Sequence, residues 1–163
     1  IDKHAAHERM NFDRMKAEGY DPMSQTLLAP AVCRLSPEEH AALTARLPLL
    51  EEFGFAAEDF GGGALIVRRA PFDVDPGDIE ATLTEIARKL LSTGSADPAA
   101  ARDELLHTMA CKAAIKGGWR TSPQELERMA RAVMSGQVRY CPHGRPVAIE
   151  LTRGQLEKQF KRA

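Results

Sequence analysis

The order of strand and helix signals between residues 26 and 93 constrains the fold of this chain more than any other feature. The run from Leu27 to Leu35 is typical of a strand, and Ser36-Pro37-Glu38-Glu39 is a capping box with proline in the first helical turn. Gly61-Gly62-Gly63 separates two short runs that we expect to pair as a hairpin. Four apolar residues then recur at helical spacing: Ile79, Leu83, Ile86 and Leu90. Strand, helix, hairpin and helix in this order predict a compact lobe.

Helix signals also flank this lobe. Asp2 is placed to cap a helix from His4 to about Glu18, and Gly19 is suited to end it. Further helices are expected at three other signals: Pro98, Ser122 and Thr152. Two late segments alternate as strands do: Val138 to Tyr140, and Val147, Ile149 and Leu151. Inside the lobe, leucines at helical spacing predict one helix that kinks at Pro48: Leu43, Leu47 and Leu50.

Composition places the chain among folded proteins. With 44% hydrophobic and 28% charged residues among 163, it can bury a core, and no apolar run approaches the roughly 20 residues that span a bilayer. Its start lacks an initiator Met and a signal peptide, so we expect a piece of a longer protein. Three widely spaced cysteines argue against a disulfide framework and indicate the cytosol. The balance of 22 basic against 23 acidic residues gives no broad footprint for nucleic acid.

Two pairs of side chains are candidates for metal binding. His4 and Glu8 lie four apart on the predicted helix, so they share one face, and Asp2 adds a carboxylate at the helix start. A surface His-Glu pair with a capping aspartate is the alternative explanation. Cys141 and His143 can both reach one metal from a turn that a glycine and two prolines fix. Here the alternative is a half-buried cysteine beside a turn histidine.

The remaining cysteines and histidines carry weaker signals. Cys111, in the middle of a predicted helix, is by itself more typical of a core residue than of a ligand. Cys33, in a strand of the other lobe, is expected in the core. His40 and His107 are expected to be ordinary surface or boundary residues.

Four segments, in order along almost the whole chain, resemble the motifs of the MutL family of mismatch-repair proteins. They are Asp2-Lys3-His4-Ala5-Ala6-His7-Glu8-Arg9-Met10-Asn11-Phe12-Asp13, Ala110-Cys111-Lys112, Cys141-Pro142-His143-Gly144-Arg145-Pro146 and Phe160-Lys161-Arg162. Three positions depart from the family pattern: Lys3 stands for glutamine, Asp13 for glutamate and Lys112 for arginine. The chain is similar to the C-terminal dimerisation and endonuclease domain of that family.

The resemblance implies an α/β (α+β) fold of two lobes. Residues 1–25 and 94–163 are expected to form an inner lobe for dimerisation and catalysis, and residues 26–93 an inserted outer, regulatory lobe. It also implies a homodimer. The strand and helix signals independently predict a compact insert in the same place.

The resemblance further implies a metal-dependent endonuclease that nicks one strand of duplex DNA. The implied catalytic residues are Asp2, His4 and Glu8, and the implied metal ligands are His4, Glu8, Cys111, Cys141 and His143. The softer donors favour zinc, in a structural or regulatory role, and the carboxylates favour manganese or magnesium for cleavage. Five motif positions are expected to support the site or contact phosphate: Arg145, Lys112, Asp13, Phe160 and Arg162.

Partners follow from the resemblance as well. Gln25-Thr26-Leu27-Leu28-Ala29-Pro30 resembles the family segment that contacts the replicative sliding clamp, through Gln25, Leu28 and Pro30. An ordinary strand entry, with Leu27 or Leu28 in the core, is the alternative. The near-neutral charge predicts weak DNA binding by the isolated domain. A mismatch-recognition protein is expected to be reached through the full-length, ATP-binding protein, in the bacterial cytoplasm near the nucleoid and away from membranes.

Two other functions remain open from the sequence. The first is a non-catalytic dimerisation and clamp-docking module whose cysteines bind structural zinc; it predicts bound zinc and no nicking with any divalent metal. The second is an unrelated zinc hydrolase for a small molecule, which predicts activity without DNA.

Overall fold

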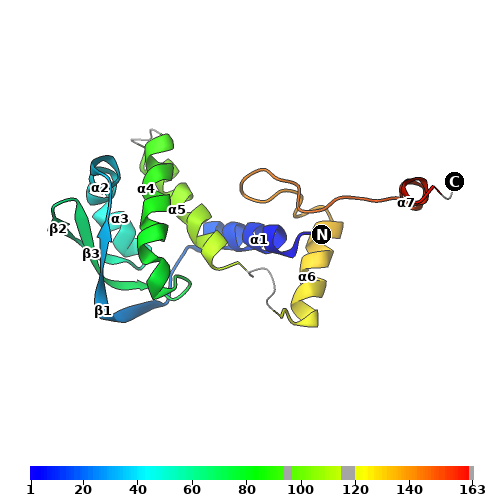
Figure 1. Cartoon of the computed structure of the whole chain (residues 1–163). Coiled ribbons are helices and arrows are strands. Elements are labelled where there is room, and N and C mark those ends of the chain that lie inside the picture. The colour runs from blue at the N-terminus through cyan, green and yellow to red at the C-terminus, as the bar shows by residue number, and fades with distance from the viewer. Residues whose placement is uncertain (94–96, 115–119, 162–163) are drawn as a thin grey trace. The chain divides into compact units, whose positions relative to one another are not determined.

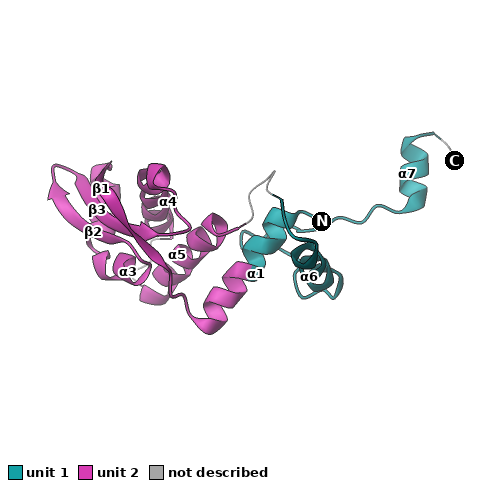
Figure 2. Cartoon of the chain, turned by 90° about the horizontal axis from the view of Figure 1, so that it is seen from below, with its two compact units in different colours: residues 1–10, 115–163 teal, residues 11–114 magenta. Residues whose placement is uncertain are grey.

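The computed structural model describes residues 1–93, 97–114 and 120–161 (Figure 1). The chain divides into two compact units: unit 1 comprises residues 1–10 and 115–163, and unit 2 comprises residues 11–114 (Figure 2). Helix α1 (Lys3–Glu18) contributes its first half to unit 1 and its second half to unit 2. Gly19 follows the helix with φ of +85°, as the sequence predicts for a helix end.

Unit 2 contains an antiparallel three-stranded sheet. Its strands are β1 (Ser24–Arg34), β2 (Ala56–Gly61) and β3 (Ala64–Pro71), in the order β1-β3-β2. The predicted hairpin is confirmed as β2 and β3, and Gly61, Gly62 and Gly63 at its turn all have positive φ. Residues with a side chain rarely adopt that backbone conformation, so the triple glycine sets the turn.

The helix after β1 begins as predicted but does not continue through Pro48. Ser36 and Glu39 form the capping box of α2 (Pro37–Thr44). A second helix, α3 (Leu47–Glu52), then begins with Pro48 in its first turn. The prediction of one kinked helix is therefore wrong, because the helix is interrupted at residues 45–46. Pro48 lacks an N–H, but in the first turn of a new helix this costs no hydrogen bond.

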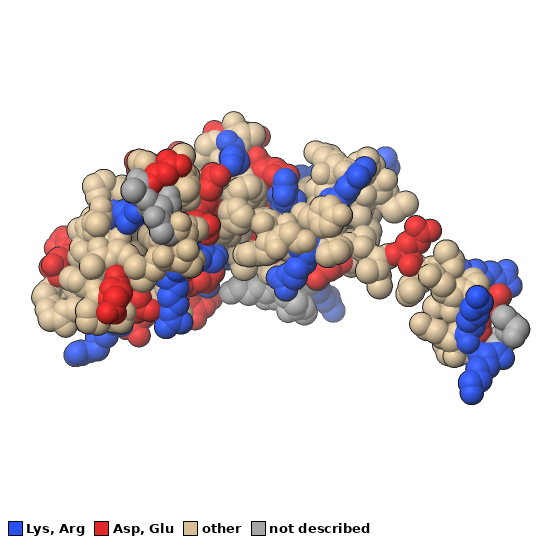
Figure 3. Space-filling view, turned by 90° about the horizontal axis from the view of Figure 1, so that it is seen from above, with Lys and Arg blue, Asp and Glu red and all other residues tan. Residues whose placement is uncertain are grey.

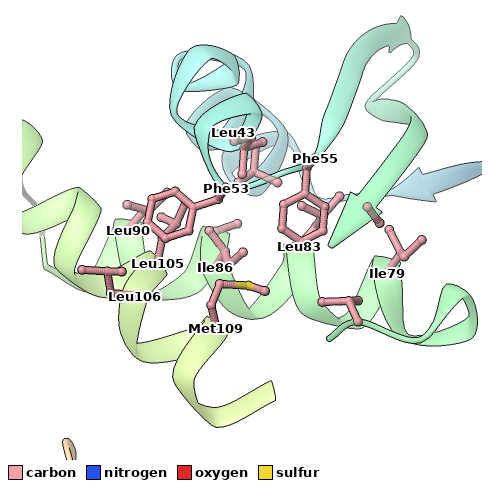
Figure 4. Close-up of a cluster of buried hydrophobic side chains, with 14 of the residues drawn as sticks. Leu43, Phe53, Phe55, Ile79, Leu83, Ile86, Leu90, Leu105, Leu106 and Met109 are labelled. Carbon is pink, nitrogen blue, oxygen red and sulfur yellow. The ribbon is translucent and has the colours of Figure 1, made fainter. Parts of the chain in front are cut away.

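One hydrophobic core holds unit 2 together (Figure 4). The 3-10 turn η1 (Pro76–Asp78) leads into α4 (Ile79–Ser92), whose predicted apolar stripe is confirmed as fully or almost fully buried. Helix α5 (Pro98–Lys112) adds Leu105, Leu106 and Met109 to the same core. Each such side chain contributes about 1.5–3 kcal/mol by leaving water. Unit 2 thus contains the whole segment 26–93 together with α5 and the end of α1.

Unit 1 has a smaller core of small side chains. It contains α6 (Pro123–Met134), capped by Ser122, and α7 (Arg153–Gln159), capped by Thr152, as predicted. The buried apolar side chains are Ala5, Ala6, Ala132, Val138, Cys141 and Val147, with Met129 of α6 also buried. A core of this size buries little apolar area, so unit 1 gains less from packing than unit 2 does.

The strand predicted over Val147, Ile149 and Leu151 does not form in the described part of unit 1. The pairing there is one bridge, between Tyr140 and Pro146, with further backbone bonds from Val147 to Arg139 and from Asp2 to Val147. Ile149 is 79% exposed and Leu151 54% exposed. The alternation is real, but a strand also needs a neighbouring backbone, and the described residues of unit 1 offer none beyond Val147.

None of the helices in the described ranges is both long and apolar enough to cross a lipid bilayer.

Candidate metal centre

A tight turn in unit 1 positions two of the predicted ligands. The N–H of Cys141 donates to the carbonyl of Arg145 at 2.8 Å, and the N–H of Gly144 donates to the carbonyl of Cys141 at 2.9 Å. Pro142 suits the second position of such a turn, and Gly144 has a φ of +79°, which disfavours any side chain there. Backbone geometry therefore fixes the spacing of Cys141 and His143.

Helix α1 brings Glu8 to this turn. Ala5 and Ala6 of the same helix pack in one core with Cys141, which holds the helix against the turn. Glu8 is 1% exposed, and its Oε1 lies 3.1 Å from Nδ1 of His143. One ligand atom from each of Glu8, Cys141 and His143 lies within 4.8 Å of the other two. Unit 1 thus brings together three of the predicted ligands.

The environment of Glu8 fits a bound cation. Although Nδ1 of His143 is close, the pair lacks hydrogen-bond geometry, and Oε1 of Glu8 has no hydrogen-bond partner among the described residues. A buried carboxylate oxygen without a partner is costly unless a cation compensates it. The donor set of a thiol, an imidazole and a carboxylate is one that zinc accepts. Cys141 is 1% exposed and His143 is exposed, so the cluster reaches the surface on the histidine side.

Asp2 and His4 lie at the start of the same helix. Oδ1 of Asp2 accepts hydrogen bonds from the N–H groups of His4 and Ala5, at 3.0 and 3.1 Å, so Asp2 is a helix cap as the sequence predicts. His4 is partly buried, and one of its ring nitrogens lies within 4.8 Å of a carboxylate oxygen of Glu8. The helical spacing therefore brings His4 and Glu8 to one face. The catalytic role of either residue stays a prediction.

Three other predicted site residues belong to unit 2. Cys111 and Lys112 lie at the end of α5, both partly buried, and Asp13 lies partly buried on the second half of α1. Nζ of Lys112 is 3.6 Å from a carboxylate oxygen of Glu85 on α4, which gives this lysine a partner inside unit 2. Their membership of the metal site stays a prediction.

Cys33 is a core residue, as expected. It is 1% exposed in β1, and burial, followed by the charge of Glu80, raises the pKa of its thiol to about 11. A thiol that stays protonated is neither a ready nucleophile nor a ready ligand.

Comparison with known proteins assigns the chain to a family. The family described as "MutL C terminal dimerisation domain" matches residues 1–121. The chain is 42% identical over 173 residues to the DNA mismatch repair protein MutL of Anaeromyxobacter dehalogenans, covering 99% of this chain and 27% of that protein. It is 38% identical to MutL of Acidiphilium cryptum, covering 100% of the chain and 29% of that protein. The chain belongs to the MutL family.

The similarity extends beyond the matched family domain. MutL of Caldanaerobacter subterraneus subsp. tengcongensis is 32% identical over 99% of this chain, and the chain spans 28% of its length. The chain therefore covers less than a third of these MutL relatives. The Cys141 turn and α7 lie after residue 121, outside the matched family domain, but within the span that these relatives cover.

The remaining MutL motif positions lie on the surface of unit 1 or outside the described residues. Arg145 is exposed beside the ligand turn, and Phe160 is exposed at the end of α7. Arg162 lies outside the described residues. Position alone does not give Arg145 or Phe160 a role.

The residues of the predicted clamp segment lie on and beside a bulge of edge strand β1. The register shifts between Thr26 and Ala31, so residues 27–30 are not paired with β3. Leu28 is 107% exposed and Pro30 is exposed, whereas Leu27 packs against the core. Nε2 of Gln25 donates to the carbonyl of Val74 at 3.2 Å. The side chain of Leu28 is thus exposed to solvent on the bulge, whereas Gln25 is hydrogen-bonded within unit 2.

Two contacts near the centre were not foreseen from the sequence. Nε2 of His7 lies 3.6 Å from Oε1 of Glu125 on α6, and Nζ of Lys3 donates to Oγ1 of Thr121 at 3.4 Å. Lys3 and His7 are four residues apart, so they share a helix face other than the one that carries His4 and Glu8. This spacing was the sequence signal that could have indicated the two contacts. Lys3, which departs from the MutL motif, has a structural partner at this position.

Proposed function

We propose that this MutL-family domain is a metal-dependent endonuclease that nicks one strand of duplex DNA. The observation that carries the proposal is the cluster of Glu8, Cys141 and His143 in unit 1, with a buried carboxylate oxygen that has no hydrogen-bond partner among the described residues. The family match supports a role in mismatch repair, since the relatives are named as mismatch-repair proteins. The activity of the whole protein, including ATP binding and contact with a mismatch-recognition protein, belongs to the same proposal.

Two kinds of metal suit the proposed donors. Cys141 and His143 are softer donors and suit zinc, and the resemblance adds His4 and Cys111 to that set. The carboxylates of Glu8 and Asp2 are hard donors and suit manganese or magnesium. A bound divalent ion supplies activation of a water molecule and neutralisation of charge on the scissile phosphate.

The side chains of the chain have separate tasks in this proposal. Glu8, held rigid by burial, orients the attacking water and accepts its proton at the carboxylate. Asp2 caps α1 through Oδ1 and thereby fixes the direction of the helix that carries His4 and Glu8. Arg145, exposed beside His143, neutralises a phosphate oxygen of the substrate.

A nicking assay with isosteric variants tests the proposal. We expect Glu8→Gln to lower the rate of nicking of supercoiled plasmid with manganese by about a hundredfold or more. Asp2→Asn keeps the helix cap, since asparagine caps as well as aspartate. Its nicking rate therefore tests the negative charge of Asp2 separately from the cap. Glu58→Gln makes the same chemical change at an exposed position of unit 2 and should be silent. Undiminished nicking by Glu8→Gln refutes the mechanism.

The dimer of the proposed enzyme has a candidate surface on unit 1. Several large apolar side chains are exposed there: Met134, Tyr140, Ile149, Leu151 and Phe160. A surface pocket of about 270 Å³ lies among Val133, Val138, Val147 and Ala148. Because the core of unit 1 is small and part of its apolar surface is uncovered, we propose that a second copy covers it and that residues 147–151 pair as a strand with that copy.

Sliding-clamp docking is the second interaction that we propose. A fully exposed leucine on a bulged edge segment that is not paired with β3 offers an apolar anchor for a partner. Gln25→Ala and Leu28→Ala should each weaken capture of the purified clamp, and Val32→Ala, also exposed on β1, serves as the control. Equal capture by the three variants contradicts clamp docking through this motif.

A non-catalytic module with structural zinc is the second candidate function. The full burial of Cys141 favours it, because structural zinc sites are enclosed by their ligands. It predicts that Cys141→Ser/His143→Ala loses most of the bound zinc and that no divalent metal supports nicking by the parent domain.

A further inference from the structure

The near-neutral charge of the chain conceals two units of opposite sign. Over its full sequence, unit 1 has 12 Lys and Arg against 6 Asp and Glu, a net charge of +6. Unit 2 has 10 against 17, a net charge of −7, and the two values add to the chain's −1. The charge of the whole chain is therefore a poor guide to what either unit attracts.

Ion pairing increases the contrast between the units. Most cations of unit 2 have a carboxylate partner: Lys16, Arg68, Arg69, Arg88, Lys89, Arg102 and Lys112. In the described part of unit 1, six cations have no carboxylate within ion-pair distance: Arg120, Arg128, Arg139, Arg145, Lys158 and Lys161. All six are exposed. Unit 1 thus has cationic groups that an external anion can approach.

These cations are arranged around the ligand turn and at the end of the chain. Arg139 and Arg145 lie on the two arms of the turn that carries Cys141 and His143, joined by the bond from Val147 to Arg139 and the bond from Cys141 to Arg145. Nε of Arg139 donates to the carbonyl of Gly136 at 3.2 Å, which steadies the guanidinium while leaving it exposed. Figure 3 shows Lys and Arg side chains gathered on α7.

We propose that unit 1 grips the phosphate backbone of duplex DNA through Arg139 and Arg145, with Lys158 and Lys161 as a second set, and that acidic unit 2 stays off the DNA. The proposal rests on the proposed nuclease function for its choice of anion. Contacts of this kind are independent of base sequence and release counterions, so the binding is steeply dependent on salt. The isolated domain then binds DNA weakly at high salt and measurably at low salt.

The choice of DNA over an acidic protein follows from the position of Arg139 and Arg145. Both flank the exposed histidine of the candidate metal centre, where a scissile phosphate has to lie. An acidic protein surface, including unit 2 of another copy, offers carboxylates to the same cations. That alternative predicts a change in self-association and no change in DNA affinity when the cations are replaced.

Charge-reversal variants in matched pairs test the proposal. We would measure fluorescence anisotropy of a labelled duplex across a salt series with zinc present and without manganese or magnesium, the ions proposed for cleavage. Arg139→Glu/Arg145→Glu and Lys158→Glu/Lys161→Glu should each weaken binding and flatten the slope of log K against log salt by about 2, at about 0.9 per lost phosphate contact. Arg34→Glu/Arg68→Glu changes the net charge equally on unit 2 and should leave the slope unchanged.

The outcomes separate this inference from the nuclease proposal. If the unit 1 and unit 2 variants change DNA affinity and its salt dependence equally, the inference is overturned even if the domain nicks DNA. Altered sedimentation with unaltered DNA affinity overturns it in favour of an acidic protein surface. Salt-dependent binding lost only in the unit 1 variants supports it, and it does so even if the parent domain cuts nothing.

Discussion

Replacing Glu8 by glutamine should raise the stability of the metal-free domain and remove most of its stabilisation by zinc. Glu8 is 1% exposed, and its Oε1 lacks a hydrogen-bond partner in the described chain, so the metal-free fold holds an unsatisfied buried acceptor. Such a group costs about 1–3 kcal/mol, and the formal charge is the costlier part. Glutamine keeps the shape and removes the charge. In EDTA, the variant should melt higher, by roughly 2–4 °C for each kcal/mol recovered.

With zinc, the same substitution should act in the opposite direction. At a zinc concentration of about 100 Kd, binding stabilises the parent by about 2.7 kcal/mol. Loss of one ligand that weakens binding about a hundredfold leaves about 0.4 kcal/mol at the same concentration. The zinc-induced rise in melting temperature should therefore shrink to a small fraction of the parent's rise.

Differential scanning calorimetry in EDTA and in excess zinc measures both effects. Glu58→Gln, an exposed glutamate of unit 2, is the control and should match the parent in both conditions. If Glu8→Gln melts lower than the parent in EDTA, the contact between Oε1 of Glu8 and Nδ1 of His143 offsets the cost of burying the carboxylate, and the reasoning is refuted. If its zinc-induced rise equals that of the parent, Glu8 is not a ligand.

Four other predictions test the fold and the surface. Leu83→Ala should lower the free energy of unfolding by about 2–5 kcal/mol in urea titrations, whereas Leu91→Ala, half-exposed on the same helix, should change it by about 0.5 kcal/mol or less. Burial raises the pKa of the Cys33 thiol to about 11, so Cys33 should react with iodoacetamide at pH 8 about a hundredfold more slowly than a free cysteine. Mass spectrometry measures the labelling, and rapid labelling would mean that β1 opens readily. The backbone hydrogen bond from Ser36, followed by the Arg88 guanidinium, lowers the pKa of Glu39 below its ordinary value of 4.5. The carboxylate therefore contributes stability above that value, and this contribution is lost as the pH falls through the folded-state pKa. Glu39→Gln should flatten the acid side of a plot of unfolding free energy against pH, and an unchanged plot would contradict this. Met134→Glu/Ile149→Glu should shift the domain from dimer to monomer in analytical ultracentrifugation, while Phe60→Glu, an exposed aromatic of unit 2, should not.

Elements whose hydrogen bonds are local could be predicted from the sequence. Ser36, Ser122 and Thr152 each cap a helix whose first turn lies within three residues of the cap. The glycines at 61–63 determine a hairpin turn by their own backbone freedom, and the stripe on α4 follows from its period. Each of these features depends on residues that are neighbours in the sequence.

Features that depend on distant residues could not be predicted. The bulge at residues 27–30 depends on pairing with β3, about forty residues later; Pro30, which has no N–H to donate, indicates an edge or a bulge, but the segment alone does not specify the shift in register. The alternation at Val147, Ile149 and Leu151 predicted a strand that does not form, because no described strand of unit 1 pairs with it. The membership of α5 in the core of unit 2, through Leu105, Leu106 and Met109, likewise depends on distant residues, and the predicted inner and outer lobes stay a prediction.

The candidate site shows the same limit. The spacing of Cys141 and His143, and of His4 and Glu8, was readable because each pair lies on one local element. That the Cys141 turn and the Glu8 helix meet, and that Glu8 is buried without a hydrogen bond, depends on the packing of α1 against residues near the other end of the chain.

Cys141 is at once a core residue of unit 1 and a member of the ligand cluster. If this cluster binds the proposed metal, folding and metal binding of unit 1, whose core is small, become one equilibrium and cannot be tuned separately. A cell short of metal would hold unit 1 in a loosened form that proteases recognise, and it would lose the protein instead of accumulating an inactive one. The abundance of the domain would in this way report the supply of its metal.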